Sequence, residues 1–379
     1  MSKFDKTIDF IKGIYPNQEF IPLHAPVFNG NEKKYVLDTI ESTFVSSVGA
    51  YVNKFEKMMR DYTGATHAIA VVNGTSALHM SLKLVGVSSG DLVITQALSF
   101  VATCNAISYL GAEPAFVDVD KDTIGMSPSS LKDFLKDVEI QQGSPIHLPT
   151  GKKIAACVPM HTFGFPCKID EIVDLCDQFS IPVVEDAAES LGSFYKKKHT
   201  GRFGKLGIFS FNGNKTITSG AGGIIITDDE NLGLKAKHLT TQAKVPHKWD
   251  FYHDEIGYNY RCSNLNSALA CAQLEQLDKF IQIKRGISSK YQLFFENEGI
   301  QYVHESENSY SNYWLNVIIL KDKSERDNFL NLTNDNNVMT RPVWTLMNKL
   351  PMFKNSFTTD LSNSEWIEER AVNIPSSVN

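Results

Sequence analysis

The feature that most constrains the fold of this chain is an alternation of short apolar runs with helical patterns between about residues 30 and 230. HAIAVV at 67–72 and DLVITQA at 91–97 are two such runs, and the helical pattern SALHMSLKLVGV at 76–87 separates them. Runs that are apolar on both faces and alternate with helices are typical of strands in a buried parallel sheet. The sequence therefore predicts an α/β fold with helices flanking a mostly parallel sheet. Further strands are predicted at EPAFVDVD, KIAACVPMH, IPVVEDAA and GGIIITDD.

The pattern changes near residue 260, which indicates a second domain. Residues 264–297 carry one long helical pattern, and a strand-like run at 313–320 and a helical run at 324–336 follow it. A chain of 379 residues is also too long for one ordinary hydrophobic core. We therefore predict a large domain over residues 30–260 and a smaller α+β domain over residues 261–379.

Two segments stand apart from this alternation. Residues 1–29 combine a helical pattern with a connecting segment that leads into the large domain. Residues 139–153 are polar, contain Gly and Pro, and are predicted to form an excursion between a helix and a strand.

The composition argues against several classes of function. The net charge is −6 and the pI is about 5.9, so we expect no broad nucleic-acid surface, although a local basic cluster could hold a small anion. No apolar run reaches membrane-spanning length, and no secretory pattern begins the chain, so we expect a cytoplasmic protein without a membrane partner. No metal site is predicted, because the cysteines form no C-x-x-C pair. The cysteines are Cys104, Cys157, Cys167, Cys176, Cys262 and Cys271.

One lysine, Lys215, lies among small polar residues and glycines in the stretch FSFNGNKTITSGAGG at 209–223. Three roles are open for it: gripping a phosphate, lying on a solvated surface, or forming a covalent bond. GNKT resembles the end of a P-loop, but that motif needs a glycine five residues before Gly213, where this chain has Ile208. No G-x-G-x-x-G follows a predicted strand, so nucleoside-triphosphate and dinucleotide sites are not predicted.

A phosphate site is instead predicted where a strand turns into a helix at NGTS, residues 73–76. Gly74 permits a close backbone approach, while Thr75 and Ser76 offer hydroxyl and N–H groups at a helix N-terminus, where the helix dipole favours an anion. The structural alternative is an ordinary Thr/Ser helix cap.

An acidic pair and an aromatic residue follow two other strands. Glu185 and Asp186 end the run IPVVED, where parallel sheets place their ligands, and Phe100 follows the run LVITQ. A carboxylate ~4 Å from a pyridine nitrogen, at an effective dielectric of ~20, contributes roughly 4 kcal/mol and keeps the ring protonated, as a pyridoxal electron sink requires. The structural alternatives are a salt bridge for the acids and core packing for Phe100.

A phosphate cup, a flat aromatic ring, a carboxylate at a strand end and a lysine beside a flexible loop are together the parts of a pyridoxal phosphate (PLP) site. In such a site the lysine bonds to the cofactor aldehyde and then acts as acid and base. The covalent role for Lys215 is therefore the one that the combination favours.

Six motifs, in this order, resemble the sugar aminotransferases of the DegT/DnrJ/StrS family. That resemblance implies the type I PLP-transferase fold, which is the fold of aspartate aminotransferase. The motifs are NGTSAL (73–78), SFVATCNAI (99–107), PMHTFGFP (159–166), VVEDAAESLGS (183–193), FSFNGNK (209–215) and GYNYRCSNLNSAL (257–269).

The resemblance assigns roles to individual residues. Lys215 would be the covalent and proton-transferring lysine, and Asp186 would face the ring nitrogen. Members of the family build each active site across a dimer, so Asn259 would reach the phosphate of a neighbouring subunit's cofactor, and a homodimer is expected. The remaining cofactor contacts would come from Gly74, Thr75, Ser76, Phe100, Glu189 and Ser210.

The resemblance also implies a reaction, the transfer of an amino group from glutamate to a nucleotide-linked keto sugar for a bacterial surface glycan. A UDP-4-keto-6-deoxy-2-acetamido-hexose is the substrate it most favours. The alternatives are a PLP-dependent sugar dehydratase, in which His replaces the lysine, and a non-catalytic regulator on the same fold. The chain departs from many members at Glu189, where they have His or Gln, and at Met347 and Asn348, in a motif where they have a His.

Several polar and aromatic residues near these motifs are candidate substrate contacts. Each also has a structural alternative, as a solvated charge, a core histidine or a packed aromatic. They are Lys33, His161, Arg261, Arg341 and Trp344, with Lys34 and Arg202 as further basic residues beside the motifs.

Overall fold

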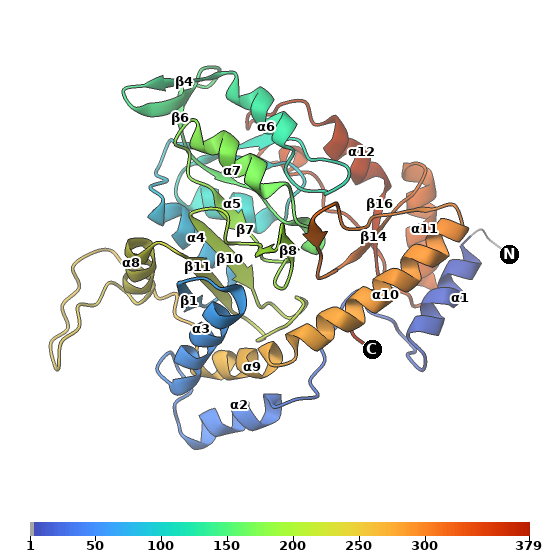
Figure 1. The fold of residues 1–379 in the computed structure, drawn as a ribbon, viewed down its shortest axis with the longest axis horizontal. Coiled ribbons are helices and arrows are strands. Elements are labelled where there is room, and N and C mark those ends of the chain that lie inside the picture. The colour runs from blue at the N-terminus through green and yellow to red at the C-terminus, as the bar shows by residue number, and fades with distance from the viewer. Residues whose placement is uncertain (1–3) are drawn as a thin grey trace.

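A seven-stranded sheet forms the centre of the molecule in a computed structural model that describes residues 4–379 (Figure 1). It consists of two hydrogen-bonded sets of strands. Parallel bridges connect the two sets, between Cys157 and Val183 and between Met160 and Asp186. From one edge to the other the strands are β1 (His67–Val71), β11 (Gly223–Thr227), β10 (Leu206–Ser210), β7 (Val184–Asp186), β6 (Lys152–Val158), β2 (Leu92–Gln96) and β3 (Glu113–Val117).

Most neighbouring strands of this sheet are parallel. β10 pairs with β7 in parallel, and β2 pairs in parallel with both β3 and β6. β11 is antiparallel to β10 and to β1. The predicted α/β fold with a mostly parallel sheet is thus confirmed, and the carboxyl ends of β7 and β10 bring Asp186 and Ser210 to the same edge.

Helices cover the sheet, and three of them begin at a residue whose side chain caps them. Asn73, Ser127 and Asp229 each accept a hydrogen bond from an N–H group of the helix that follows. The helices of this part are α2 (Glu32–Glu41), α3 (Ala50–Thr63), α4 (Gly74–Leu84), α5 (Val101–Tyr109), α6 (Pro128–Leu135), α7 (Ile169–Asp177), α8 (Glu230–Thr240) and the 3-10 turn η1 (Thr162–Gly164).

The polar stretch 139–153, predicted as an excursion between a helix and a strand, largely forms a hairpin. β4 (Val138–Gln141) pairs with β5 (Ser144–His147), which pairs in turn with β6. A second small sheet joins β8 (Phe194–Tyr195), β9 (Lys198–His199) and β13 (Ser309–Tyr310).

The C-terminal part contains a separate antiparallel sheet. Its strands, in order, are β12 (Gln301–Tyr302), β14 (Asn316–Ile319), β16 (Ala371–Ile374) and β15 (Arg341–Pro342). This α+β arrangement matches the predicted class of the second domain. The helices around it are α1 (Asp5–Ile14), α10 (Leu277–Asn297), α11 (Lys323–Asp335) and α12 (Ser362–Arg370), with the 3-10 turn η2 (Met347–Lys349).

Two helices pack against parts of the chain that are distant from them in the sequence. The helical pattern 264–297 is broken into α9 (Asn264–Leu274) and α10, and α9 packs on α2 and α3 rather than on the C-terminal sheet. At the other end, Ile8 and Ile11 of α1 share a core with Ile318 and Val372. Long α10 lies between the two parts.

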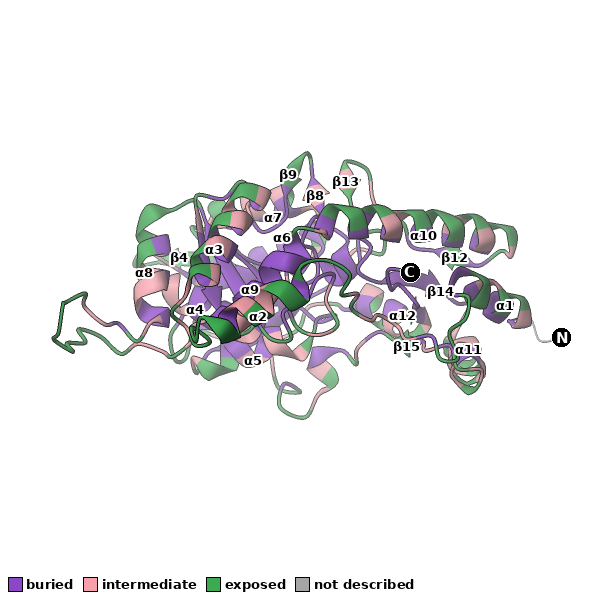
Figure 2. Cartoon of the chain, turned by 90° about the horizontal axis from the view of Figure 1, so that it is seen from below, coloured by how far each residue is buried: buried purple, intermediate pink, exposed green. Residues whose placement is uncertain are grey.

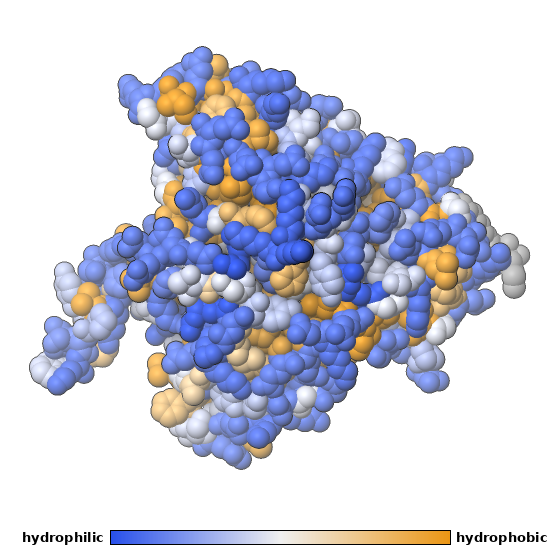
Figure 3. Space-filling view, viewed as in Figure 1, coloured by the Kyte–Doolittle hydropathy of each residue, from blue (hydrophilic) through white to orange (hydrophobic). Residues whose placement is uncertain are grey.

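A segment of residues 244–257, which we call the arm, extends from α8 away from the rest of the molecule (Figures 2 and 3). It carries large apolar side chains that are unusually open to solvent: Trp249 is 76% exposed, Phe251 77% and Ile256 82%. Over residues 4–379, no helix combines the length and the apolar character needed to cross a membrane.

Candidate active site

A cavity of about 390 Å³ lies where the central strands end and α4 and α5 begin. It brings together residues that are far apart in the sequence, including most of the predicted cofactor contacts. The predicted residues that line it are Gly74, Thr75, Phe100, Asp186, Glu189, Ser210, Lys215 and Trp344.

The first turn of α4 forms one wall of the cavity. The Asn73 side chain accepts the N–H of Ser76 at 2.7 Å, so the cap holds the turn while Gly74 and Thr75 face the cavity. A Cβ on Gly74 would lie 2.9 Å from the Cβ of Ser210, so only glycine lets α4 and β10 approach this closely. Backbone amides and hydroxyls at a helix N-terminus form a site suited to a phosphate.

The two acids at the end of β7 face different surroundings. Glu185 is fully buried, and its carboxylate accepts the N–H groups of Gly201 and Gly204, both at 2.7 Å, and contacts His161 Nε2 at 2.9 Å. Asp186 instead lines the cavity and is 3% exposed. The structural alternative therefore holds for Glu185, and the site carboxylate is that of Asp186.

Asp186 is fixed by two hydrogen bonds. The Thr103 hydroxyl donates to its Oδ2 at 2.7 Å, and the N–H of Ala188 donates to its Oδ1 at 3.2 Å. Burial raises the pKa of Asp186, and these two hydrogen bonds and the charge of Lys215 oppose that rise. A cationic group bound in the cavity would therefore find a buried, oriented carboxylate partner.

Lys215 points into the same cavity. Its Nζ lies 3.0 Å from Oε1 of Glu189 and 4.0 Å from the centre of the Trp314 ring. The N–H of Phe163 donates to the other oxygen of Glu189 at 2.8 Å. Burial raises the pKa of Glu189, and the neighbouring charge of Lys215 opposes that rise. The lysine is thus directed at the cavity by a carboxylate on one side and an aromatic face on the other.

Three aromatic side chains line the cavity, namely Phe100, Trp314 and Trp344. Phe100, the residue before α5, is 46% exposed, and its ring centre lies 5.8 Å from that of Trp344. A planar ligand could stack on such a surface. Phe100 is therefore not a core residue, and Trp344 is placed where it could contact a substrate.

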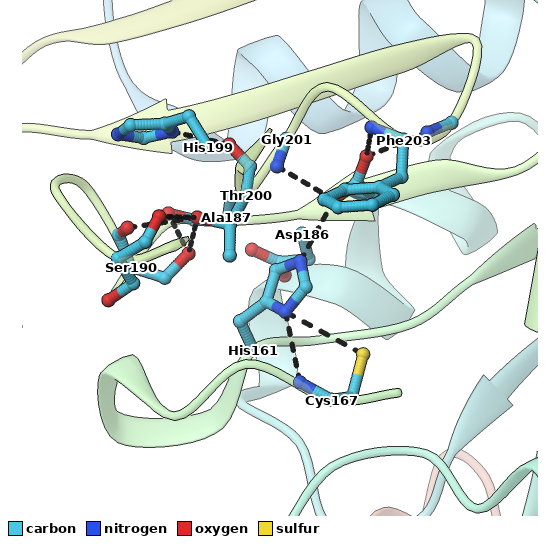
Figure 4. Close-up of polar contacts among 12 residues, drawn as sticks. His161, Cys167, Asp186, Ala187, Ser190, His199, Thr200, Gly201 and Phe203 are labelled. Atoms are coloured by element: carbon cyan, nitrogen blue, oxygen red, sulfur yellow. Dashed lines mark hydrogen bonds and ion pairs between the residues drawn. The ribbon is translucent and has the colours of Figure 1, made fainter. Parts of the chain in front are cut away.

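His161 lies outside the cavity lining. It is fully buried, contacts Glu185, and accepts the N–H of Cys167 on Nδ1 at 3.3 Å (Figure 4). Burial lowers the pKa of His161, whereas the neighbouring Cys167 and Glu185 raise it. The structure thus favours the core-histidine alternative, and the predicted substrate contact is corrected.

Five other predicted contacts also lie away from the cavity. Ser76 faces a smaller neighbouring cavity with His79 and Tyr260. The exposed Asn259 accepts hydrogen bonds from Arg261, the exposed Arg341 donates to Asn334, and none of these three predicted contacts lines the cavity. Lys33 is exposed on α2. A contact of Asn259 with a neighbouring subunit stays a prediction.

Sequence reasoning missed the contribution of the C-terminal part, Asn312 and Trp314. Trp314 lines the cavity and donates its Nε1–H to the carbonyl of Asn214 at 2.7 Å. Asn312 donates to the carbonyl oxygens of Glu189 and Leu191, both at 2.9 Å. The segment NYWLN reads as the start of a strand, and no local signal shows which distant loop it meets.

Fold and site together define a PLP-dependent transferase of fold type I, in which a lysine and a strand-end carboxylate open onto one cavity. The chain belongs to the DegT/DnrJ/EryC1/StrS aminotransferase family, whose model matches residues 27–379. It is accordingly a PLP-dependent sugar aminotransferase.

The similarity to individual proteins extends along nearly the whole chain. The GDP-perosamine synthase of Escherichia coli O157:H7 is 37% identical over 358 residues, which cover 94% of this chain and 93% of that protein. The putative pyridoxal phosphate-dependent aminotransferase EpsN of Bacillus subtilis is 37% identical over 88% of this chain and 84% of its own length. The solved Helicobacter pylori aminotransferase PseC superposes with a TM-score of 0.85 at 22% identity, over 94% of this chain and 93% of that one, and supports the fold.

Proposed function

We propose that this protein transfers an amino group from glutamate to a GDP-linked 4-keto-6-deoxy sugar, with Lys215 as the covalent residue. The observation that carries the proposal is the placement of Lys215 and the buried Asp186 on one cavity beside the first turn of α4. A protein that only bound the cofactor would not need a carboxylate to keep the ring cationic, which argues against a regulator.

The residues present fit PLP. The cavity of about 390 Å³ has an anion-binding helix turn, an aromatic wall and a buried acid. Gly74, Thr75 and Ser210 would hold the phosphate, Phe100 would cover a ring face, and Asp186 would bind the ring nitrogen. When bound, the cofactor supplies an aldehyde that captures amines and a ring that accepts the electron pair released by proton removal.

The chain's own residues then supply binding and proton transfer. The Nζ of Lys215 serves first as the bonding amine and afterwards, once free, as the group that takes a proton from the donor and returns one to the sugar. Glu189, at 3.0 Å, keeps this amine directed into the cavity. The Asp186 carboxylate stabilises the positive ring by roughly 4 kcal/mol at ~4 Å and an effective dielectric of ~20.

Relatives support the choice of nucleotide. GDP-perosamine synthases of Escherichia coli, Vibrio cholerae and Caulobacter vibrioides are 37%, 35% and 32% identical to this chain. These relatives favour GDP over the UDP-linked acetamido sugar expected from the motifs. The retained Lys215 argues against the dehydratase alternative.

We also propose a homodimer. The apolar side chains of the arm, Trp249, Phe251 and Ile256, are 76%, 77% and 82% exposed. Aromatic residues this open on a projecting segment are typical of a contact surface. A second copy would cover them and bring the GYNYR segment with Asn259 to another cavity.

The test is to incubate PLP-loaded protein with glutamate and a panel of GDP-, UDP- and dTDP-linked 4-keto-6-deoxy sugars. We expect amino-sugar formation with the GDP substrate and loss of the visible cofactor absorbance on adding glutamate. Amino-sugar formation only with a UDP-linked acetamido sugar would instead support the substrate that the sequence motifs favour. Ammonia release without an amino sugar would show the dehydratase, and a spectrum that no amino donor changes would show a regulator.

A further inference from the structure

Trp314 makes a contact with Lys215 that the reaction described above leaves unused. The centre of the indole ring lies 4.0 Å from Lys215 Nζ, and Glu189 contacts the same Nζ at 3.0 Å. The lysine side chain is only 13% exposed. An aromatic face attracts an ammonium most strongly where water is excluded. Carboxylate and ring therefore form two walls of a place that suits the free, charged lysine.

We propose that Trp314 is a positioning residue that holds the freed ammonium of Lys215 against Glu189 whenever the lysine is not bonded to the cofactor. The proposal rests on the covalent role of Lys215 given above. It adds that the C-terminal part of the chain, which carries Trp314, sets how stable the state with a free lysine is.

The indole is held rigidly enough for this role. Its Nε1–H donates to the carbonyl of Asn214, next to Lys215, at 2.7 Å. The main-chain N–H of Trp314 donates to Asn312 Oδ1 at 2.8 Å, and its carbonyl accepts from the buried Lys284 Nζ at 3.1 Å. The main-chain bonds fix the backbone of Trp314, and the ring cannot turn away without breaking its Nε1–H bond to Asn214.

The same segment also fixes the second wall. The Asn312 amide donates to the main-chain carbonyl of Glu189 at 2.9 Å and contacts the hydroxyl of Thr216, the residue after Lys215, at 3.2 Å. Residues 312–314 therefore fix the lysine's loop, its carboxylate partner and its aromatic partner together. Such convergence exceeds what packing of an isolated tryptophan requires.

The contacts of Lys215 Nζ with Trp314 and Glu189 stabilise the states in which the lysine is free. They do not stabilise the state in which the lysine is bonded to the cofactor. In a half-reaction with glutamate, the enzyme changes from the form with Lys215 bonded to the form with Lys215 free and the cofactor as its amine. Removing the ring by Trp314→Leu is therefore expected to shift this equilibrium about 10-fold toward the bonded form. Trp314→Phe keeps an aromatic face and should stay within about 3-fold of wild type.

The experiment measures that equilibrium by absorbance at known glutamate and 2-oxoglutarate concentrations. A matched control is Trp366→Leu, because Trp366 also faces a lysine, Lys121 at 4.4 Å, and does not line the cavity. A cofactor-free readout is a double-mutant cycle of Trp314→Leu with Lys215→Met in the apoprotein, where thermal midpoints should be non-additive by about 2 °C. If Trp314→Leu does not fold, fluorinated tryptophan at position 314 weakens the ring's attraction at nearly constant shape and should shift the equilibrium in the same direction.

An equilibrium within 2-fold of wild type, a shift toward the free-lysine form, an equal shift in the Trp366→Leu control, or additive midpoints would overturn the proposal. Failure of the covalent role itself is distinguishable, because wild-type protein would then carry no reducible cofactor bond at Lys215. In that case the apoprotein cycle still reports whether Trp314 contacts the ammonium.

Discussion

The addition of a single methyl group at Gly74 tests the proposed phosphate site most sharply. A Cβ at this position would lie 2.9 Å from Ser210 Cβ and 3.1 Å from Ser210 Oγ, both closer than ordinary contact. Gly74→Ala must therefore push the first turn of α4 away from the end of β10. Overpacking of this kind costs about 1–3 kcal/mol.

That cost falls on the geometry that would hold the phosphate, so the Kd for PLP should rise by about 10- to 100-fold. Gly286→Ala is the matched control, since Gly286 also lies in a helix, α10, and a Cβ there would meet nothing within 4 Å. Calorimetric titration of both apoproteins with pyridoxamine phosphate gives the affinity without covalent bonding. If the folded Gly74→Ala protein bound within 3-fold of wild type, the phosphate would not lie against this turn.

Further predictions concern a buried amine, the site acid and the arm. Burial lowers the pKa of Lys284 to about 7, below the ~10.4 of an unfolded lysine, so between these values the unfolded state binds more protons. The unfolding free energy of wild type relative to Lys284→Met should then rise by about 1.4 kcal/mol per pH unit from pH 7 upward; equal differences in urea unfolding at pH 7 and pH 9 would contradict this. Asp186→Asn should slow the glutamate half-reaction by about 10³-fold in single-turnover kinetics, from the roughly 4 kcal/mol lost, and a loss under 10-fold would argue against its ring contact. Wild type should sediment at about twice 42.3 kDa, and Trp249→Glu with Phe251→Glu should give a single chain; a monomeric wild type would refute the dimer.

The sequence predicted the large sheet well because its signal is local. Strands that are buried on both faces are apolar along their whole length, and HAIAVV, LVITQ and GGIIIT show this directly, although the first and the last form antiparallel pairs in the sheet. The motif residues Gly74, Asp186 and Lys215 reach one cavity because strand ends converge at one edge of a parallel sheet. Topology was therefore enough to place them.

Features that depend on packing between distant segments could not be predicted from the sequence. The pattern of 264–297 continues across Glu275 and Gln276, so it cannot show that α9 packs on α2 and α3 and that a separate helix, α10, follows it. His161 and Glu185 look like site residues by position, yet their side chains are hydrogen-bonded to each other, and Glu185 also accepts buried N–H groups. Trp314 reads as a strand residue, and only the tertiary fold places it over Lys215.

The covalent role of Lys215 can be measured directly. Wild-type protein is loaded with PLP, reduced with borohydride and digested, and the modified peptide is located by mass spectrometry, with Lys205 of the same β10 region as an internal comparison. We expect one reduced adduct, on Lys215, and its loss when glutamate is added before reduction. An adduct on another lysine, or one that glutamate does not remove, would contradict the account.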